Sequence, residues 1–360
     1  MLKGLILCGG KGSRLWPLTF TRPKHLLPVM NKPVLFYGIE SMIDAGITDI
    51  GIVVPPAYRE AFEAAVQGGA PWNIETTLIE QPEPRGLADA VRVAEEYVGE
   101  EDFLLYLGDN VIDGSLAPLV ERFQSERLEG LVSVSPVQRP ERFGVVQLTG
   151  DRLERVVEKP KHPPSNLAIN GVYLFRHSLF GAIRTLRPSA RGELEITDAI
   201  QMLVDGGYHI GVFRSPYWWK DTGLADDLLQ CNRHYLEKLE GLRLKGEIDE
   251  ASSVTSRVVI GENAKVIRSV IRGPAVIGDH AVIEDSYIGP YTSIAPNVRV
   301  IRTEIENSIV LERAVLENVP RRIDESLIGA CAKVAGRTDA PASSVKMRLG
   351  DHSGFELPPR

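Results

Sequence analysis

The sequence is short of the features that mark secreted, membrane-spanning and nucleic-acid-binding proteins. Only three of its 360 residues are cysteines, Cys8, Cys231 and Cys331, and their odd number and wide spacing favour reduced thiols over a disulfide framework or a metal knuckle. No apolar stretch approaches the length of a membrane span, and the N-terminal run that ends at Leu7 is too short for a signal peptide. No run of lysines or arginines forms a basic stripe, so we expect a cytoplasmic protein that binds neither nucleic acid nor membrane.

The composition is otherwise that of a globular protein with more than one domain. Hydrophobic residues make up 43% and charged residues 25%, and 41 basic against 48 acidic residues give a formal charge of -7. A chain of this length exceeds the size at which a single core usually stops growing, so we expect two domains. An acidic protein can still bind a polyanionic substrate, but it then needs a pocket of local positive charge.

Up to about residue 240, short apolar runs alternate with segments of helical periodicity. The apolar runs are residues 5–7, 50–54, 103–107, 130–134 and 172–175, and the helical segments include 35–45 and 88–97. This alternation predicts an α/β domain over residues 1–240, Rossmann-like, with a mixed and mostly parallel sheet. Ligands of such sheets bind beyond the carboxyl ends of the strands, so we expect the site there.

After a charged segment at 236–250 the periodicity changes. An aliphatic residue recurs every five or six positions, and every third one lies 17 residues from its counterpart, as in Ile260, Ile277 and Ile294. Antiparallel strands would alternate by two, whereas stacked three-sided coils produce this spacing. The pattern predicts a left-handed parallel β-helix over residues 248–345, less regular after about 311, and a C-terminal tail over 346–360.

A glycine-rich loop follows the first expected strand and runs from Gly9 to Arg14. Glycines allow a backbone to approach phosphate and to point its N–H groups at the anion, a following helix would add its positive end, and Lys11 and Arg14 supply charge. The loop fits neither the dinucleotide fingerprint nor the Walker loop. By itself it predicts a phosphate site and no particular reaction.

The surrounding motifs resemble those of the sugar nucleotidyltransferases, in particular the long glucose-1-phosphate thymidylyltransferases that carry a β-helix. The resemblance rests on the runs at residues 9–17, 22–29, 81–88, 107–110, 158–160, 191–198 and 218–223. It implies a nucleotidyltransferase domain over 1–240 that works as a homo-oligomer. It also implies nucleotide contacts at Gly9, Gly10, Gly12, Ser13, Gln81 and Gly86.

The resemblance further implies a magnesium site and a sugar-phosphate site. Asp109 and Asp221 offer hard oxygen ligands of the kind that hold Mg²⁺ beside phosphates, and the family places its metal at these two positions. Lys159 would hold the phosphate of the sugar phosphate, and Glu158 would accept hydrogen bonds from sugar hydroxyls. The remaining residues implied for the sugar pocket are Leu87, Gly144, Asn170, Val172 and Trp219.

The expected reaction joins dTTP to glucose-1-phosphate and releases pyrophosphate, giving dTDP-glucose for activated-sugar biosynthesis. The sugar-phosphate oxygen would attack the α-phosphorus in line, while Arg14, Lys24 and Lys159 act as catalytic cations. A glutamine amide at Gln81 carries both a donor and an acceptor, so it reads the imide edge of thymine or of uracil, and UTP remains an alternative substrate. An acetyltransferase activity of the β-helix is a second alternative, with His280 and His352 as its candidate histidines.

Overall fold

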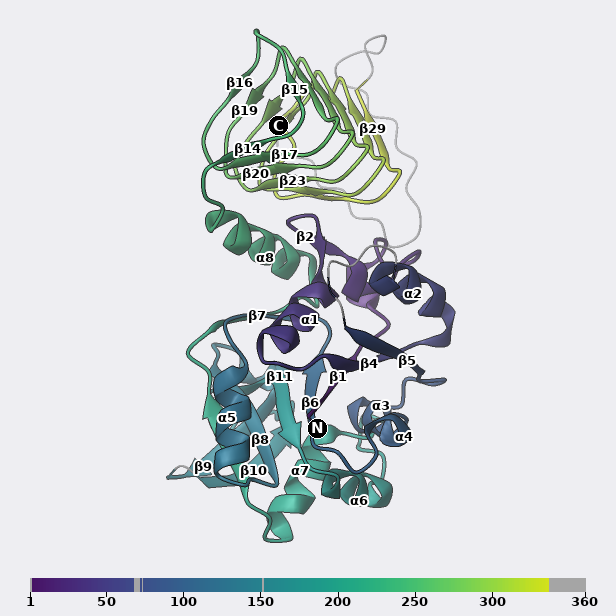
Figure 1. Cartoon of the computed structure of the whole chain (residues 1–360), viewed down its shortest axis with the longest axis vertical. Coiled ribbons are helices and arrows are strands. Elements are labelled where there is room, and N and C mark those ends of the chain that lie inside the picture. The colour runs from purple at the N-terminus through teal and green to yellow at the C-terminus, as the bar shows by residue number, and fades with distance from the viewer. Residues whose placement is uncertain (1, 68–71, 73, 151, 337–360) are drawn as a thin grey trace. The chain divides into compact units, whose positions relative to one another are not determined.

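The computed structural model describes residues 2–67, 72, 74–150 and 152–336, and its chain forms two units (Figure 1). The first unit comprises Met1–Lys11 and Val34–Asp221. The second comprises Gly12–Pro33 and Thr222–Arg360. The chain therefore enters the second unit in the middle of the glycine-rich loop and returns to the first unit at Val34.

The first unit contains a mixed sheet whose central strands run in the order β10-β9-β11-β6-β1-β4-β5, with β8 pairing to β11 and β12 to β8. Its strands are β1 (Lys3–Leu7), β4 (Asp49–Val54), β5 (Glu75–Glu80), β6 (Phe103–Leu107), β8 (Gly130–Pro136), β9 (Gly144–Thr149), β10 (Arg152–Glu158), β11 (Leu167–Phe175) and β12 (Ile210–Arg214). Each of the five expected apolar runs lies in one of these strands. The α/β prediction is confirmed.

The sheet is parallel from β6 through β1 and β4 to β5, and again between β12 and β8. Strand β11, which contains the expected run 172–175, instead runs antiparallel to β6, β8 and β9. Strands β9 and β10 form an antiparallel hairpin, whose short connection excludes a parallel pairing. Strand β11 lies on the other side of β9 and runs in the same direction as β10.

Seven α-helices of the described chain belong to the first unit. They are α1 (Val34–Asp44), α2 (Arg59–Gln67), α3 (Leu87–Arg92), α4 (Glu95–Val98), α5 (Ala117–Ser125), α6 (Ser178–Thr185) and α7 (Ile196–Asp205). The segment expected as one helix over 88–97 is broken at Ala94, where φ and ψ of −93° and 4° leave helical values. Phe103 lies at the centre of the core, 6.0 Å from the Phe175 ring and 5.7 Å from the Phe180 ring. No described helix is both long enough and apolar enough to cross a membrane.

Two short strands stand apart from the main sheet. Strand β7 (Asn110–Asp113) pairs antiparallel with β13 (Trp218–Asp221), and the register places Asp221 opposite Asn110. Strand β7 begins three residues after β6 ends, so this ladder continues directly from the carboxyl end of a central strand.

The second unit contains a β-helix with three parallel sheets. The first consists of β14 (Leu242–Leu244), β17 (Val258–Ile260), β20 (Ala275–Ile277), β23 (Thr292–Ile294), β26 (Ile309–Val310) and β28 (Leu327–Ile328). The second consists of β15 (Glu247–Ile248), β18 (Lys265–Ile267), β21 (Val282–Glu284), β24 (Arg299–Ile301), β27 (Val315–Glu317) and β29 (Lys333–Ala335), and the third of β16 (Ser253–Val254), β19 (Val270–Ile271), β22 (Tyr287–Ile288) and β25 (Glu304–Ile305).

The aliphatic column identified in the sequence fills the interior of these coils. Ile260, Ile277 and Ile294 pair in one sheet and are at most 1% exposed. The spacing slips near the expected place, because Ser293 pairs with Ile309 and Ile309 with Leu327. The parallel sheets fit the expected left-handed β-helix, while the end of the expected β-helix beyond 336 and the expected tail at 346–360 lie outside the described residues.

The remaining elements of the second unit come from two distant parts of the chain. Segment 12–33 contains two three-residue 3-10 turns, η1 (Ser13–Leu15) and η2 (Lys24–Leu26), and the hairpin of β2 (Pro28–Val29) and β3 (Lys32–Pro33). Helix α8 (Ala225–Glu237) precedes the β-helix. After the glycine loop only the turn η1 forms, because Pro17 has no N–H and an α-helix does not continue through it, so no α-helix end faces the loop there.

Candidate active site

The glycine loop begins where β1 ends, against the side chain of Gln81. A Cβ atom built on Gly9 would lie 2.4 Å from Gln81 Oε1, a distance that no real side chain tolerates. Gln81 itself follows β5 and is only 4% exposed. Gly9 therefore permits a close approach between the loop backbone and this amide oxygen, which a side chain there would displace.

The other half of the Gln81 amide is held by an acidic residue. Its Nε2 donates to Asp89 Oδ2 at 2.9 Å and also lies 3.4 Å from the carbonyl oxygen of Gly86. Asp89 is 3% exposed and accepts a second hydrogen bond from Arg92 Nη2 at 2.6 Å. The carboxylate thus fixes which way the amide faces and leaves Oε1, an acceptor, on the side of Gly9.

Gly86 occupies a position that excludes other residues. Its φ of 115° is rare for residues with a side chain, and an added Cβ would lie 2.4 Å from the carbonyl oxygen of Leu194. The N–H of Ala88 donates to that same oxygen at 3.0 Å, and the N–H of Leu194 donates to Arg85 at 2.7 Å. The loop over residues 85–88 is therefore fastened to the segment just before α7.

The two predicted metal ligands lie at the same end of the β7–β13 ladder. Asp221 ends β13 opposite Asn110, and Asp109 immediately precedes Asn110. The Asn110 side chain accepts from Trp219 Nε1 at 2.6 Å and donates to Asp109 Oδ1 at 3.2 Å. Asn110 thereby links the predicted sugar-pocket residue Trp219 to the carboxylate of Asp109.

Glu158 and Lys159 lie at the end of β10. The Lys159 Nζ is 3.4 Å from Glu158 Oε1, and Arg191 Nη1 is at the same distance from that oxygen. A Cβ on Gly144 would lie 3.2 Å from Glu158 Oε2, so the glycine leaves room beside this carboxylate. Lys159 has a φ of 38°, a conformation that residues with side chains adopt mainly at strained and functional sites.

Arg191 connects Glu158 to a second carboxylate, that of Glu195. Arg191 Nη1 lies 3.1 Å from Glu195 Oε1, and Ser189 Oγ donates to the same oxygen at 2.9 Å. Burial raises the pKa of Glu195, and the negative charge of Glu158 acts in the same direction, although Ser189 and Arg191 oppose them. The positive charge of Arg191 therefore offsets the repulsion between the two carboxylates.

Among the predicted sugar-pocket residues, Asn170 carries the clearest sign of a missing ligand. It is fully buried, its Nδ2 donates to Ser135 Oγ at 3.1 Å, and its Oδ1 has no hydrogen-bond partner among the residues that the structure describes. A buried acceptor without a partner is costly, so this oxygen is suited to a hydroxyl donor. Val172 is fully buried and Leu87 packs against the core, so both support the predicted sugar pocket from its core side.

These first-unit residues lie close together. Gly108 follows β6, and a Cβ built there would lie 2.6 Å from Cys8 Sγ, which places the glycine loop beside the start of the Asp109 turn. A Cβ on Gly171 would lie 2.8 Å from Asn110 Nδ2, which places the Asn170 segment beside the same turn. The structure thus gathers these groups beyond the carboxyl ends of β1 and β6.

The other predicted phosphate-binding residues belong to the second unit. Ser13 and Arg14 lie in η1 and are exposed, and Lys24 begins η2. Gly12 has a φ of 65°, and a Cβ on it would lie 3.3 Å from Lys24 Cβ. The chain between them folds back, so Lys24 is held next to the glycine loop.

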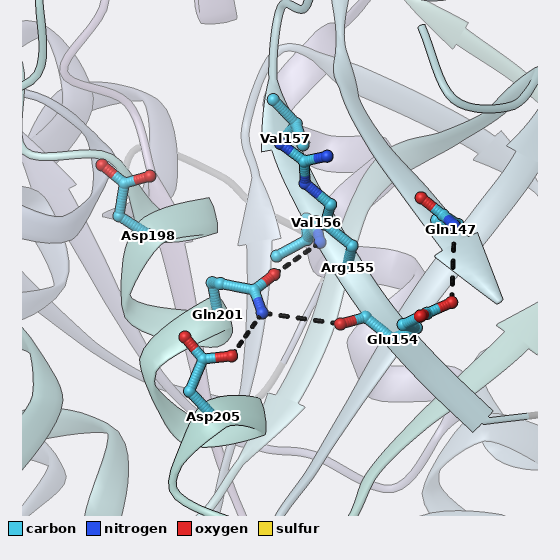
Figure 2. A pocket seen from close by; sticks show the side chains of 8 residues that line it. All are labelled: Gln147, Glu154, Arg155, Val156, Val157, Asp198, Gln201 and Asp205. Atoms are coloured by element: carbon cyan, nitrogen blue, oxygen red, sulfur yellow. Dashed lines mark hydrogen bonds between the residues drawn. The ribbon is translucent and has the colours of Figure 1, made fainter. Parts of the chain in front are cut away.

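An open groove of about 650 Å³ lies elsewhere on the first unit, between α7 and strands β9 and β10 (Figure 2). The Gln201 amide crosses it, accepting from the N–H of Val156 at 2.8 Å and donating to Asp205 Oδ1 at 2.8 Å. Three carboxylates line this groove against a single arginine, Arg155. It contains none of the predicted site residues, and its charge is unsuited to a triphosphate.

Three structurally important residues received no role from the sequence, namely Asp89, Arg191 and Thr197. Asp89 orients Gln81, Arg191 bridges Glu158 and Glu195, and Thr197 Oγ1 lies 3.5 Å from Glu158 Oε2. Arg191 and Thr197 belong to the run at 191–198 that carries the family resemblance. A role for Arg191 and Thr197 could therefore have been predicted from that run. The role of Asp89 could not, because its contact with Gln81 forms only when α3 folds against the end of β5.

The sequence matches the profile of the family described as nucleotidyl transferase over residues 3–238. The chain belongs to this family. The enzyme class predicted from the motifs is confirmed.

Known relatives resemble the chain over its whole length. A glucose-1-phosphate thymidylyltransferase of Streptomyces antibioticus is 46% identical over 358 residues, covering 99% of each chain. One of Streptomyces griseus is 42% identical over 357 residues, again covering 99% of each. Among solved structures, a UDP-glucose pyrophosphorylase complexed with UDP-glucose matches 66% of this chain and all of its own with a TM-score of 0.60 and 25% identity.

Proposed function

We propose that the protein transfers a thymidylyl group from dTTP to glucose-1-phosphate, giving dTDP-glucose and pyrophosphate. The observation that carries this proposal is the Gln81 amide, whose donor is engaged by Asp89 and whose acceptor faces Gly9. The full-length identity to glucose-1-phosphate thymidylyltransferases supports the choice of both substrates.

The fixed amide suits a base that donates a hydrogen bond from its ring. Thymine and uracil carry an N–H at ring position 3, which the Gln81 oxygen accepts in this proposal. Adenine and cytosine present an acceptor at the corresponding position, so they would place two acceptors face to face. In this proposal Gly86 contributes backbone groups to the same base, and its lack of a side chain lets its loop pack against the Leu194 backbone.

The sugar phosphate binds through a cation and two hydrogen-bond acceptors. Lys159 holds its phosphate, while Glu158 and the buried oxygen of Asn170 accept hydrogen bonds from sugar hydroxyls. Trp219 and Gly144 shape the adjoining space, with Leu87 and Val172 packed behind it.

The carboxylates of Asp109 and Asp221 fit a magnesium ion. Both are hard oxygen ligands at the same end of one ladder, and Mg²⁺ is commonly held by one or two carboxylates together with substrate phosphates. When bound, the ion neutralises phosphate charge and polarises the α-phosphate.

The transfer needs no protein nucleophile. An oxygen of the sugar phosphate forms a bond to the α-phosphorus, and the bond from that phosphorus to the bridging oxygen of pyrophosphate breaks. The attacking monoester is already anionic, so catalysis depends on positioning and on stabilising negative charge. Arg14 and Lys24 supply that charge to the α-phosphate and the departing pyrophosphate, and Gly9, Gly10, Gly12 and Ser13 supply backbone and hydroxyl donors.

The proposal is tested by incubating the protein with magnesium and glucose-1-phosphate together with each nucleoside triphosphate in turn. Release of pyrophosphate is expected to be fastest with dTTP, and chromatography should show dTDP-glucose in equal amount. Absence of release with every triphosphate would contradict the proposal.

Uridylyl transfer is a second candidate, because the structural match to a UDP-glucose pyrophosphorylase and the fixed Gln81 oxygen both permit uracil. The ratio of kcat/KM for dTTP to that for UTP decides between the two. Acetyl transfer by the β-helix has no comparable support, since His280 is an exposed corner residue and His352 lies outside the described residues.

A further inference from the structure

Segment 12–33, which carries Arg14 and Lys24, packs with α8 and the β-helix in the second unit. The segment is distant in sequence from both of these partners. Its contacts therefore show what holds these two cations.

Asn232 of α8 is the polar centre of this packing. It is fully buried, and its Oδ1 accepts from the N–H of Met30 at 2.9 Å and from Ser293 Oγ at 2.7 Å. Its Nδ2 donates to the carbonyl oxygen of Tyr291 at 3.1 Å. One side chain thus joins segment 12–33, α8 and strand β23.

Two further polar contacts reach the segment directly from the β-helix. Arg22 forms a two-point ion pair with Glu312, of which the Nη1 to Oε2 distance is 3.3 Å. Asn31 Nδ2 donates to the carbonyl oxygen of Ile294 at 2.7 Å. Arg22 lies two residues before Lys24, so this ion pair acts close to a predicted catalytic cation.

Apolar packing closes the remaining space. Leu18, Leu27 and Pro28 of the segment lie around a cavity of only about 10 Å³, whose other lining residues are Leu228 of α8 and Ile309, Leu311 and Leu327 of the β-helix. A cavity of this size holds at most one water molecule, so the junction is closely packed.

The segment is also tied internally. Thr19 Oγ1 donates to the carbonyl oxygen of Gly12 at 2.7 Å, and a Cβ on Gly12 would lie 3.3 Å from Lys24 Cβ. Fixing Arg22 and Met30 therefore limits the movement of the turn that bears Arg14.

We propose that the β-helix is a positioning element for the transfer reaction, with Asn232 and Glu312 as positioning residues that hold the segment bearing Arg14 and Lys24. This inference rests on the proposed function. It assigns to the β-helix a catalytic contribution that does not require an activity of its own.

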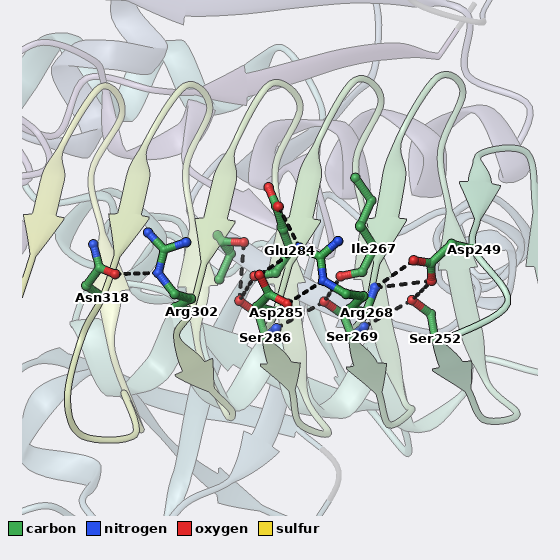
Figure 3. Close-up of polar contacts among 11 residues, drawn as sticks. Asp249, Ser252, Ile267, Arg268, Ser269, Glu284, Asp285, Ser286, Arg302 and Asn318 are labelled. Atoms are coloured by element: carbon green, nitrogen blue, oxygen red, sulfur yellow. Dashed lines mark hydrogen bonds and ion pairs between the residues drawn. The ribbon is translucent and has the colours of Figure 1, made fainter.

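The test compares steady-state kinetics of the full-length protein carrying Asn232→Ala or Glu312→Ala with a matched control, Asp285→Ala. Asp285 forms an ion pair of the same kind with Arg268, at 2.7 Å, on a corner of the β-helix (Figure 3). The contacts with segment 12–33 described above instead involve residues in or beside β23, β26 and β28. Misplacement of a charge-stabilising group by about 1 Å can cost up to about a hundredfold in rate, so we expect kcat to fall about tenfold in the first two variants. The KM for glucose-1-phosphate, whose predicted ligands belong to the first unit, should change less than about twofold.

Hydrogen exchange provides a readout that does not depend on turnover. Amides of residues 12–33 should lose protection in Asn232→Ala and Glu312→Ala, while those of β1 and β6 and those of the control stay unchanged. Glu312 is partly exposed, so its variant keeps the test valid if Asn232→Ala fails to fold.

An unchanged kcat in both variants, or an equal loss in Asp285→Ala, would overturn the inference and leave the β-helix a stabilising element only. Absence of pyrophosphate release by the unaltered protein would instead overturn the proposed function, and the inference with it. Measuring the unaltered protein first separates the two outcomes.

Discussion

At the scale of single residues, the base selectivity in the proposed function depends on Asp89, which acts through its hydrogen bond with Gln81. Asp89 accepts from both Gln81 and Arg92, and these bonds determine which end of the Gln81 amide is exposed. An amide group presents either a donor or an acceptor, depending on its neighbours. The carboxylate is what selects the acceptor.

We predict that Asp89→Asn weakens the preference for dTTP. The new side chain has one oxygen, and if it continues to accept from Arg92, its NH₂ group faces Gln81 and favours the flipped amide. The base then meets a donor, so kcat/KM for dTTP should fall about 5- to 30-fold, the value of about one to two kcal/mol of lost hydrogen bonding. The activity with dCTP relative to dTTP should rise.

Steady-state kinetics with both triphosphates would measure this change. The KM for glucose-1-phosphate serves as the internal control, because Glu158, Lys159 and Asn170 are untouched. A variant that loses activity equally with all triphosphates would contradict the assigned role of Asp89.

Arg14 is the residue at which the proposed charge stabilisation can be tested most directly. Its side chain is exposed in η1, so Arg14→Ala removes charge without creating a cavity. Loss of a preorganised charge-stabilising group costs on the order of 10² to 10³ in rate. Single-turnover measurements should show a loss of that size, and a nearly unchanged rate would exclude Arg14 from the mechanism.

Residues whose type is required by the chemistry can be predicted from the sequence. Residues that act through a neighbour cannot. Gln81, Asp109 and Lys159 could be proposed from motif and residue type alone. Asp89 could not, because its contact with Gln81 exists only after α3 has folded back on the end of β5. Their roles in catalysis stay predictions that the kinetic tests address.

At the scale of elements, the β-helix is held by a ladder of hydroxyl groups as well as by its aliphatic interior (Figure 3). Ser252 Oγ accepts from the N–H of Ser269, and Ser269 Oγ accepts from the N–H of Ser286, each at 3.0 Å. Ser286 Oγ accepts in turn from the N–H of Thr303 at 3.1 Å. One corner of each coil is therefore bonded to the next by a side chain.

Ser269→Ala should destabilise the β-helix without affecting catalysis. The substitution leaves the buried N–H of Ser286 without its acceptor, which costs about 1–3 kcal/mol. Thermal unfolding followed by circular dichroism should show a midpoint lowered by several degrees, while kcat at 25 °C stays within about twofold of the unaltered protein. Ser253→Ala, at an exposed serine of the same coil region, should change neither.

Element types were predictable wherever one periodicity ran for long enough. The 17-residue spacing located the coils of the β-helix because each coil repeats the same inward positions. The 3-10 turn after the glycine loop could not be predicted, because a single turn leaves no periodicity in the local sequence. The antiparallel direction of β11 was likewise not predictable, because periodicity does not encode strand direction.

At the scale of the whole molecule, the chain is divided in a way that composition does not reveal. The sequence places a boundary near residue 240, where the periodicity changes, and leaves residues 12–33 with the rest of the N-terminal half. The structure groups those residues with the chain after Thr222. The contacts responsible, such as that of Arg22 with Glu312 across 290 positions, have no local signature.

That long-range ion pair gives the protein a specific pH dependence. Burial alone would raise the pKa of Glu312, but the hydrogen bond and positive charge of Arg22, together with the charge of Arg313, outweigh burial and hold the pKa below its ordinary value. The ionised Glu312 therefore stabilises the folded state at pH values above the pKa of a glutamate in the unfolded chain, which is about 4.3. Its contribution is lost as the pH falls through the lower pKa of the folded state.

The difference in thermal midpoint between the unaltered protein and Glu312→Gln isolates this contribution, because glutamine does not titrate. The unaltered protein should be the more stable at pH 6–8, and the difference should shrink below about pH 4.3 as Glu312 takes up a proton. High salt should also reduce the difference at neutral pH, since both side chains are partly exposed and therefore screened. A difference that stays constant from pH 7 to pH 3 would mean that Glu312 acts through packing, and that the charge of Arg22 contributes nothing to holding segment 12–33.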